Sequence, residues 1–207
     1  MSYGEGARCK LCIFSRSPKL GGVKTRLARD IGDEQALSAH ISLVERCLEQ
    51  VTGIEGFDVE LWIDGSLSNP LVQSWVSAWS LVLRRQGIGD LGLKMSLAAR
   101  EALQSSDSVI IIGTDCPPID SSYLRKANNY LEIYDLVLGP AQDGGYGLIG
   151  FKRYFPELFM DIPWGTQHVF RSTLSKAKKL GLKIQVLETI WDVDILKDWK
   201  RFLELLS

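Results

Sequence analysis

Three aspartates in this 207-residue sequence have the type and spacing of ligands for a divalent metal ion. Asp115 follows the apolar run 109–112, and Asp192 and Asp194 lie two residues apart near the other end of the chain. Alternate side chains of an extended segment project to one side, so Asp192 and Asp194 can act together. We predict that the three carboxylates hold Mg²⁺ or Mn²⁺ on the phosphates of a nucleotide. Taken alone, Asp194 is explained equally well as the cap of the last helix.

A cationic stretch, residues 15–27, follows the first apolar run and has the composition of a phosphate-binding loop. Glycines let a backbone approach the ligand closely, while Lys, Arg and hydroxyl groups bind phosphate oxygens. The glycine spacing departs from the Walker A motif, which argues against an ordinary P-loop ATPase. A solvated basic loop is the alternative. The residues predicted to bind phosphate are Arg16, Ser17, Gly21, Gly22, Lys24, Thr25 and Arg26, with Lys24 and Arg26 also neutralising the leaving group.

A second glycine-rich stretch, residues 86–92, precedes a long amphipathic segment. Three glycines within six residues indicate either positive φ angles or a flat ligand lying against the backbone. We interpret the stretch as a base or ribose pocket formed by Gln86, Gly87, Gly89 and Asp90. Asp90 by itself is better explained as the N-cap of the following helix.

A third stretch, residues 139–147, contains the triplet Asp143-Gly144-Gly145, which first indicates a hairpin turn. A turn is compatible with a binding site, and Asp143 is the one candidate that we nominate for a general base. The residues predicted to contact the acceptor or a sugar are Gly139, Pro140, Asp143, Gly144, Gly145 and Tyr146.

Short apolar runs alternate with stretches of helical period, which is typical of βαβ units and a mostly parallel sheet. In such sheets ligands bind beyond the carboxyl ends of the strands, where the loops described above lie. Strands are predicted at 9–15, 57–63, 81–85, 108–113, 136–140, 147–151 and near 184–187. Helices are predicted at 35–51, 71–78, 91–104, 121–131, 167–180 and 195–206, with Asp33 capping the first and Asp120 or Ser121 the fourth. Short links in the second half leave no room for crossover helices, so an antiparallel strand is expected there.

The composition excludes several classes of protein. With 24 Lys and Arg against 25 Asp and Glu and 45% hydrophobic residues, the chain is neither a nucleic-acid coat nor disordered. No apolar segment is long enough to span a membrane, and no linker divides the sequence, so we expect one cytoplasmic domain over residues 1–207. Cys9 and Cys12 form a CxxC motif within a predicted strand, where packed cysteines are favoured over a redox pair.

Six stretches of the sequence, taken in order along the chain, resemble the motifs of a family of bacterial GT-A-like nucleotide-diphospho-sugar transferases. The matching residues are 14–27, 86–92, 113–117, 139–146, 163–165 and 192–194. This family is similar in turn to the 2-phospholactate and molybdenum-cofactor guanylyltransferases. The resemblance implies a three-layer, Rossmann-like GT-A α/β sandwich with a mixed, mostly parallel sheet. It also implies that Asp115 takes the place of the strand-end metal aspartate. Sugar transferases of this fold commonly present an Asp-x-Asp triplet, whereas 115–117 offers one acid, so Asp192 and Asp194 must compensate.

The resulting hypothesis is a metal-dependent enzyme that transfers a glycosyl group from a nucleoside diphosphate sugar to a small-molecule acceptor. Nucleotidyl transfer to a phosphorylated small molecule, with release of pyrophosphate, uses the same cations and carboxylates and is the alternative. A non-catalytic nucleotide-binding protein is the alternative from another class. Neither a nucleic-acid partner nor a membrane span is expected.

Overall fold

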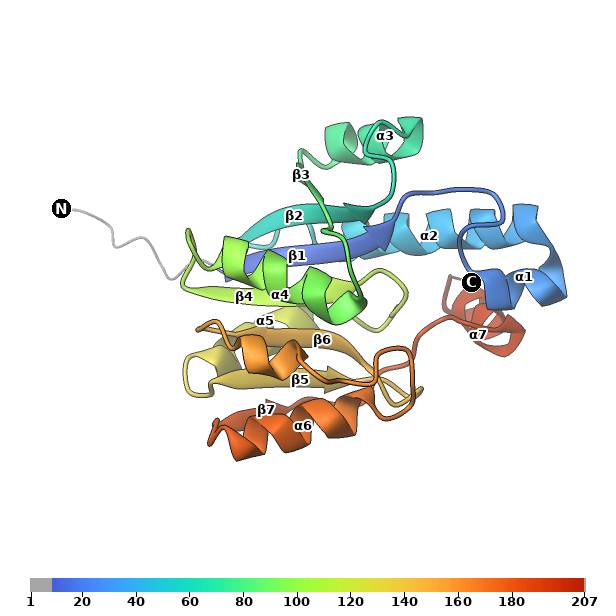
Figure 1. Ribbon diagram of the computed structural model, residues 1–207. Helices are drawn as coiled ribbons and strands as arrows, with labels where there is room; N and C mark the ends of the chain where they lie inside the picture. Colours follow the sequence, from blue (N-terminus) through green and yellow to red (C-terminus); the bar gives the residue numbers. More distant parts are fainter. Residues whose placement is uncertain (1–8, 207) are drawn as a thin grey trace.

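A seven-stranded sheet forms the centre of the computed structural model, which describes residues 9–206 (Figure 1). Across the sheet the strand order is β3-β2-β1-β4-β6-β5-β7. β6 runs antiparallel to both of its neighbours, and the other paired strands are parallel. The strands are β1 (Cys9–Arg16), β2 (Phe57–Asp64), β3 (Val82–Arg85), β4 (Ser108–Gly113), β5 (Leu136–Pro140), β6 (Tyr146–Phe151) and β7 (Ile184–Val186). The predicted α/β class with a mixed, mostly parallel sheet is confirmed, including the antiparallel strand in the second half.

Seven α-helices and one 3₁₀ helix are present within residues 9–206. They are α1 (Thr25–Ile31), α2 (Asp33–Val51), α3 (Pro70–Ala78), α4 (Leu91–Ala102), α5 (Ser121–Leu131), the 3₁₀ helix η1 (Pro156–Phe159), α6 (Val169–Lys179) and α7 (Leu196–Leu206). The predicted cap of α2 was wrong, because Gly32 is the N-cap and Asp33 is already helical. Asp120 caps α5 by accepting a hydrogen bond from the Tyr123 amide at 2.8 Å.

The helices cover both faces of the sheet and give three layers. One core cluster joins the sheet to α2, α3 and α5, and the other joins it to α4, η1 and α6. Alternation along β1 divides its side chains between the clusters, with Leu11 in the first and Cys12 in the second. None of the helices within residues 9–206 combines the length and apolar character needed to cross a membrane.

The four cysteines are buried and free, and none forms a disulfide. Cys9 and Cys12 enter different core clusters, on opposite faces of β1. Burial raises the pKa of the Cys9 thiol to about 12 and raises the pKa of the Cys12 thiol as well. The interpretation of this CxxC motif as packed strand cysteines is therefore confirmed.

A third, smaller cluster joins α7 to α2 and to the segment before α7; Figure 1 shows α7 beside α1, at the right of the picture. Phe202 of α7 packs there with Leu43 of α2 and with Trp191 and Val193 of the preceding segment. This packing brings the segment 191–194 back to the carboxyl ends of the parallel strands, where the cationic loop 15–27 ends.

Candidate active site

Lys24 lies at the centre of a group of charged residues beyond the carboxyl ends of the parallel strands, which we call the charged edge. Its backbone adopts the left-handed region (φ 47°, ψ 42°), which costs a residue with a Cβ about 1 to 2 kcal/mol. Its ammonium group donates to the Val193 carbonyl at 2.7 Å and lies 3.4 Å from Asp115 Oδ2. Backbone strain of this kind is retained where surrounding contacts determine it and is concentrated at functional sites. Lys24 therefore joins the first loop, the end of β4 and the segment before α7.

Asp115 and Asp192 form a pair of carboxylates next to Lys24. The Val193 amide donates to the Asp115 carbonyl at 2.9 Å, which fixes the segment 191–194 against the end of β4. Burial raises the pKa of Asp115, but the charge of Lys24 and the hydrogen bonds from Lys24, Cys116 and the backbone together outweigh this effect and hold the pKa below its ordinary value. Burial, reinforced by the nearby carboxylates of Asp115 and Asp143, raises the pKa of Asp192 to about 6. Neighbouring acids with pKa values shifted in opposite directions are characteristic of functional sites.

Asp194 is paired with Arg26 rather than with Lys24. Its carboxylate accepts a hydrogen bond from Arg26 Nη1 at 2.6 Å. Trp191 and Val193 are buried while Asp192 and Asp194 are partly exposed, so the predicted alternation along this segment is present. Within residues 9–206, however, no group of three or more His, Cys, Asp or Glu side chains has an arrangement that could hold a metal ion. The three-carboxylate metal site thus stays a prediction, and Asp115 and Asp192 are its closest approximation.

His40 lies next to the candidate site and was not predicted from the sequence. It is buried on α2, and its Nε2 lies 3.0 Å from the Arg16 carbonyl at the start of the cationic loop 15–27. Burial lowers the pKa of His40, as do the charges of Lys24 and Arg16, whereas the Arg16 carbonyl and Asp115 raise it. A histidine among the mostly apolar buried residues of α2 was the available signal.

The side chain of Gln86 anchors the start of the second glycine-rich loop, residues 86–92. The side-chain amide of Gln86 is buried, and its Nε2 donates to the carbonyls of Ser15 and Trp62 at 3.1 and 2.9 Å. These bonds tie the end of β3 to β1 and β2, so the donor groups of Gln86 are already used within the protein. Asp90 caps α4 by accepting from the Leu93 amide at 2.8 Å, the alternative given above. Base binding by this loop stays a prediction.

The Asp143-Gly144-Gly145 turn closes the hairpin between β5 and β6. The Asp143 carboxylate accepts from the Gly145 amide at 2.8 Å and is otherwise exposed, on the side of Asp192 and Arg26. Tyr146 points elsewhere: burial raises the pKa of its hydroxyl, which lies beside Thr173 of α6 without a partner at hydrogen-bonding geometry. Only the ring of Tyr146 is therefore available as a wall for a ligand.

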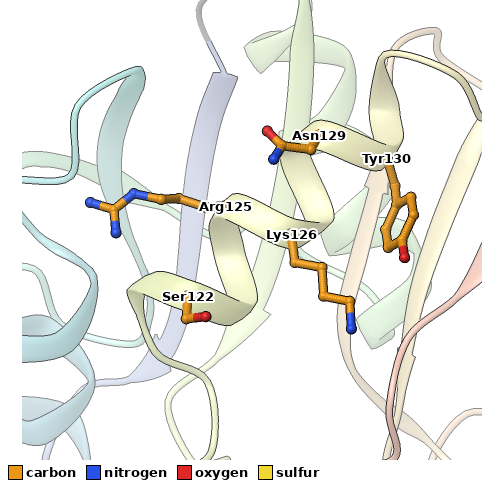
Figure 2. Close-up of a pocket in the computed structure, with 5 residues that line it drawn as sticks. All are labelled: Ser122, Arg125, Lys126, Asn129 and Tyr130. Carbon is orange, nitrogen blue, oxygen red and sulfur yellow. The ribbon is translucent and has the colours of Figure 1, made fainter.

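Two surface hollows lie away from this charged edge. Figure 2 shows one, of about 490 Å³, on the outer side of α5; the other, of about 430 Å³, lies on the outer side of α6. The α5 hollow is lined by Ser122, Arg125, Lys126, Asn129 and Tyr130. Neither hollow contains a residue predicted from the sequence to bind substrate or metal.

The fold and the charged edge together define a class of protein. A mixed seven-stranded sheet with helices on both faces, and a cationic loop after β1 facing acids after β4, is the GT-A or nucleotidyltransferase-like arrangement of the nucleotide-diphospho-sugar transferase superfamily. The model of the family described as "Uncharacterized protein conserved in bacteria (DUF2064)" matches residues 47–166, and the chain belongs to this family. None of the curated proteins matches the sequence.

Solved structures agree with this assignment. A candidate nucleotide-diphospho-sugar transferase from Desulfovibrio desulfuricans G20 is 30% identical, with a TM-score of 0.83 over 91% of this chain and 83% of that chain. The expected resemblance to this family is thereby confirmed. The 4-diphosphocytidyl-2C-methyl-D-erythritol synthase from Anaerococcus prevotii DSM 20548 is 12% identical, with a TM-score of 0.67 over 97% and 96% of the two chains. This likeness shows the fold alone.

A more distant structure was solved with metal and nucleotide. Glucosyl-3-phosphoglycerate synthase from Mycobacterium tuberculosis, in complex with Mn²⁺, uridine diphosphate and glucosyl-3-phosphoglycerate, is 12% identical to this chain. Its TM-score is 0.51 over 90% of this chain and 71% of that chain. The GT-A fold of the present chain therefore occurs in a protein that binds a nucleoside diphosphate together with a divalent ion.

Proposed function

We propose that this protein transfers a glycosyl group from a nucleoside diphosphate sugar to a hydroxyl group of a small-molecule acceptor. The observation that carries the proposal is the contact of Lys24 with Asp115 and with the Val193 carbonyl. It brings a cation suited to a diphosphate to the same point as two carboxylates suited to a divalent ion. The structural relative from Desulfovibrio desulfuricans, described as a candidate nucleotide-diphospho-sugar transferase, supports sugar transfer as the reaction.

Each charged residue has a role in this reaction. The acceptor oxygen attacks the anomeric carbon of the sugar, the bond from that carbon to the diphosphate breaks, and the nucleoside diphosphate leaves. Lys24 and Arg26 neutralise the charge that develops on the leaving diphosphate, an electrostatic effect that is usually the largest contribution to such a rate enhancement. Asp143, exposed on the hairpin turn, accepts the proton of the acceptor hydroxyl. The phosphate-binding residues of the first loop and those of the 86–92 loop hold the nucleotide.

A divalent ion fits the donor set of this edge. Mg²⁺ is commonly held by one or two carboxylates together with substrate phosphates and water. Asp115 and Asp192 supply two such carboxylates, and the low pKa of Asp115 keeps its charge. Asp194 would join them only after release from Arg26. The bound ion would add positive charge next to the diphosphate.

The test is product analysis with a panel of substrates. Purified protein is incubated with UDP-, GDP-, ADP-, CDP- and dTDP-hexoses, and separately with nucleoside triphosphates, in Mg²⁺ or Mn²⁺. We expect nucleoside diphosphate from at least one sugar nucleotide. Release of pyrophosphate without any nucleoside diphosphate would replace glycosyl transfer by nucleotidyl transfer. Failure of every nucleotide to bind in calorimetry would favour neither reaction and would overturn the proposal.

A matched pair of variants tests the site. Asp115→Asn removes a carboxylate that would hold the divalent ion and should lower turnover about 100-fold or more, the usual effect of losing electrostatic stabilisation of a transition state. Asp58→Asn makes the same chemical change near the start of β2, at the opposite end of the strands, where Asp58 lies 3.8 Å from Lys10. Asp58→Asn should keep full activity. Equal activity of the two variants would remove Asp115 from the site.

A further inference from the structure

The segment between η1 and α6 is adjacent to two of the candidate substrate loops. Gly92, in the first turn of α4 where the 86–92 stretch ends, leaves no room for a Cβ, which would lie 2.3 Å from Nε1 of Trp164. Gly144, in the turn between β5 and β6, is equally restricted, since its Cβ would lie 2.2 Å from the carbonyl oxygen of Gln167. Two loops more than fifty residues apart in the sequence are therefore packed against one segment, 163–168, at distances that only glycine permits.

Internal bonds fix this segment. The Thr166 hydroxyl donates to the Pro163 carbonyl at 2.8 Å and accepts from the His168 amide at 3.3 Å. The Phe170 amide donates to the Gly144 carbonyl at 2.9 Å and attaches the start of α6 to the hairpin turn. The segment is thus stabilised by its own hydrogen bonds, and the helix that follows it is attached to the hairpin turn.

Trp164 is the large side chain of the segment. Its ring meets the Tyr146 ring edge-on, with centroids 6.3 Å apart and planes at 82°. The Tyr146 hydroxyl is buried beside Thr173, and the indole is in contact with both the Tyr146 ring and Gly92. The indole is only partly buried.

The indole N–H of Trp164 is open. It donates to no group within residues 9–206, and it does not belong to the buried side-chain nitrogens and oxygens that lack a partner. Since Nε1 is not wholly buried and has no acceptor in the described part of the chain, its hydrogen is available to a ligand at the junction of the two candidate substrate loops. A rigid aromatic ring with one free donor is a typical lining of a small-molecule site.

We infer that Trp164 forms a wall of the subsite for the transferred sugar and determines specificity there, an inference that rests on the glycosyl transfer proposed above. The ligand class is a hexopyranose carried on a nucleoside diphosphate. Its apolar ring face packs on the indole, and a sugar hydroxyl accepts the Nε1 hydrogen. The nucleoside diphosphate part of the donor is held by other loops and does not depend on Trp164.

The experiment compares affinity for the whole donor with affinity for the nucleotide alone. Calorimetric titrations use the tightest-binding sugar nucleotide of the panel and the matching nucleoside diphosphate. Trp164→Ala should weaken binding of the sugar nucleotide about five- to tenfold, in the range of an aromatic packing contact, and change binding of the nucleoside diphosphate less than about twofold. Trp164→Phe keeps a ring without the N–H and should lose less.

Two further variants separate substrate contact from packing. Gly92→Ala retains Trp164 but drives a Cβ into the indole, so it should reproduce the selective loss. Trp79→Phe alters a tryptophan on the α3 side of the sheet, which belongs to the other core cluster, and should change neither affinity. Equal weakening of both ligands by Trp164→Ala and Trp164→Phe would overturn the role of Trp164 while glycosyl transfer stands. A wild-type protein that consumes only nucleoside triphosphates would overturn both.

Discussion

Replacing Gly144 with alanine tests whether the hairpin turn is seated on the segment before α6. Gly144 has a φ of 90°, and an added Cβ would lie 2.2 Å from the Gln167 carbonyl oxygen and 2.8 Å from its carbonyl carbon. Gly165 provides the matched control, because its φ is 76° and no atom lies within 4 Å of an added Cβ. Both alanine variants place a Cβ at positive φ. Only Gly144→Ala adds a collision with backbone atoms.

The expected losses follow from these two contributions. A Cβ in the left-handed region costs about 1 to 2 kcal/mol. Part of this cost, about 0.4 to 1 kcal/mol, is recovered because alanine restricts the unfolded chain. Gly165→Ala should therefore lower the free energy of unfolding by about 1 kcal/mol. Overpacking adds about 1 to 3 kcal/mol at Gly144, because a backbone carbonyl cannot rotate away as a flexible side chain can.

Urea denaturation followed by circular dichroism measures the difference. With an m-value of about 2 kcal/mol per molar urea, the midpoint of Gly144→Ala should lie about 0.5 to 1.5 M below that of Gly165→Ala. Coincident midpoints for the two variants would refute the close contact between Gly144 and Gln167. Trp164 would then lose its fixed position between the two loops.

Further predictions concern the charged edge and the buried thiols. Lys24→Met should weaken calorimetric binding of a nucleoside diphosphate about tenfold or more, since it removes a charge-assisted contact; unchanged affinity would exclude Lys24 from phosphate binding. The pKa of His40 is lowered by burial, so near pH 6.5 the unfolded chain takes up a proton that the folded chain does not, and the free energy of unfolding falls as the pH decreases. His40→Gln should show a smaller loss than wild type between about pH 7.5 and 5.5 in urea titrations; because Asp192 is common to both proteins, equal losses would contradict the assignment. Ellman's reagent should label none of the four cysteines of the native protein and all four in denaturant, because every thiol is buried; rapid native labelling would contradict the packing of β1.

The parts of the fold that the sequence predicts well are those with a buried periodic pattern. β4 is predicted residue for residue because its β-branched run 109–112 is apolar on both faces, as expected of an internal strand of a sheet covered by helices on both faces. α1 was not predicted, because only Leu27 of its seven residues is buried and the segment therefore lacks a helical pattern of apolar residues. The 3₁₀ helix η1 is a single turn and is too short to have such a pattern.

The site is predictable to the level of its loops but not of its contacts. Position at the carboxyl end of a strand placed Asp115 and Lys24 at one edge, and the structure brings them within 3.4 Å. The burial of the Gln86 amide and of the Tyr146 hydroxyl could not be predicted, since it depends on which neighbouring strand or helix each side chain meets. The contact of Gly92 with Trp164 likewise joins residues far apart in the chain, and neither residue carries a local signal for the other.

The ion pairs at the site edge explain how three acids and two cations can coexist there before a substrate binds. Lys24 with Asp115 and Arg26 with Asp194 connect the first loop to two segments distant in sequence. An incoming diphosphate offers both cations more negative charge than one carboxylate does, so we expect it to draw them from these acids. Release of Asp194 would then place a third carboxylate beside Asp115 and Asp192. The same phosphates that bind Lys24 and Arg26 would thus complete the donor set for a divalent ion, and nucleotide and metal should bind with positive cooperativity.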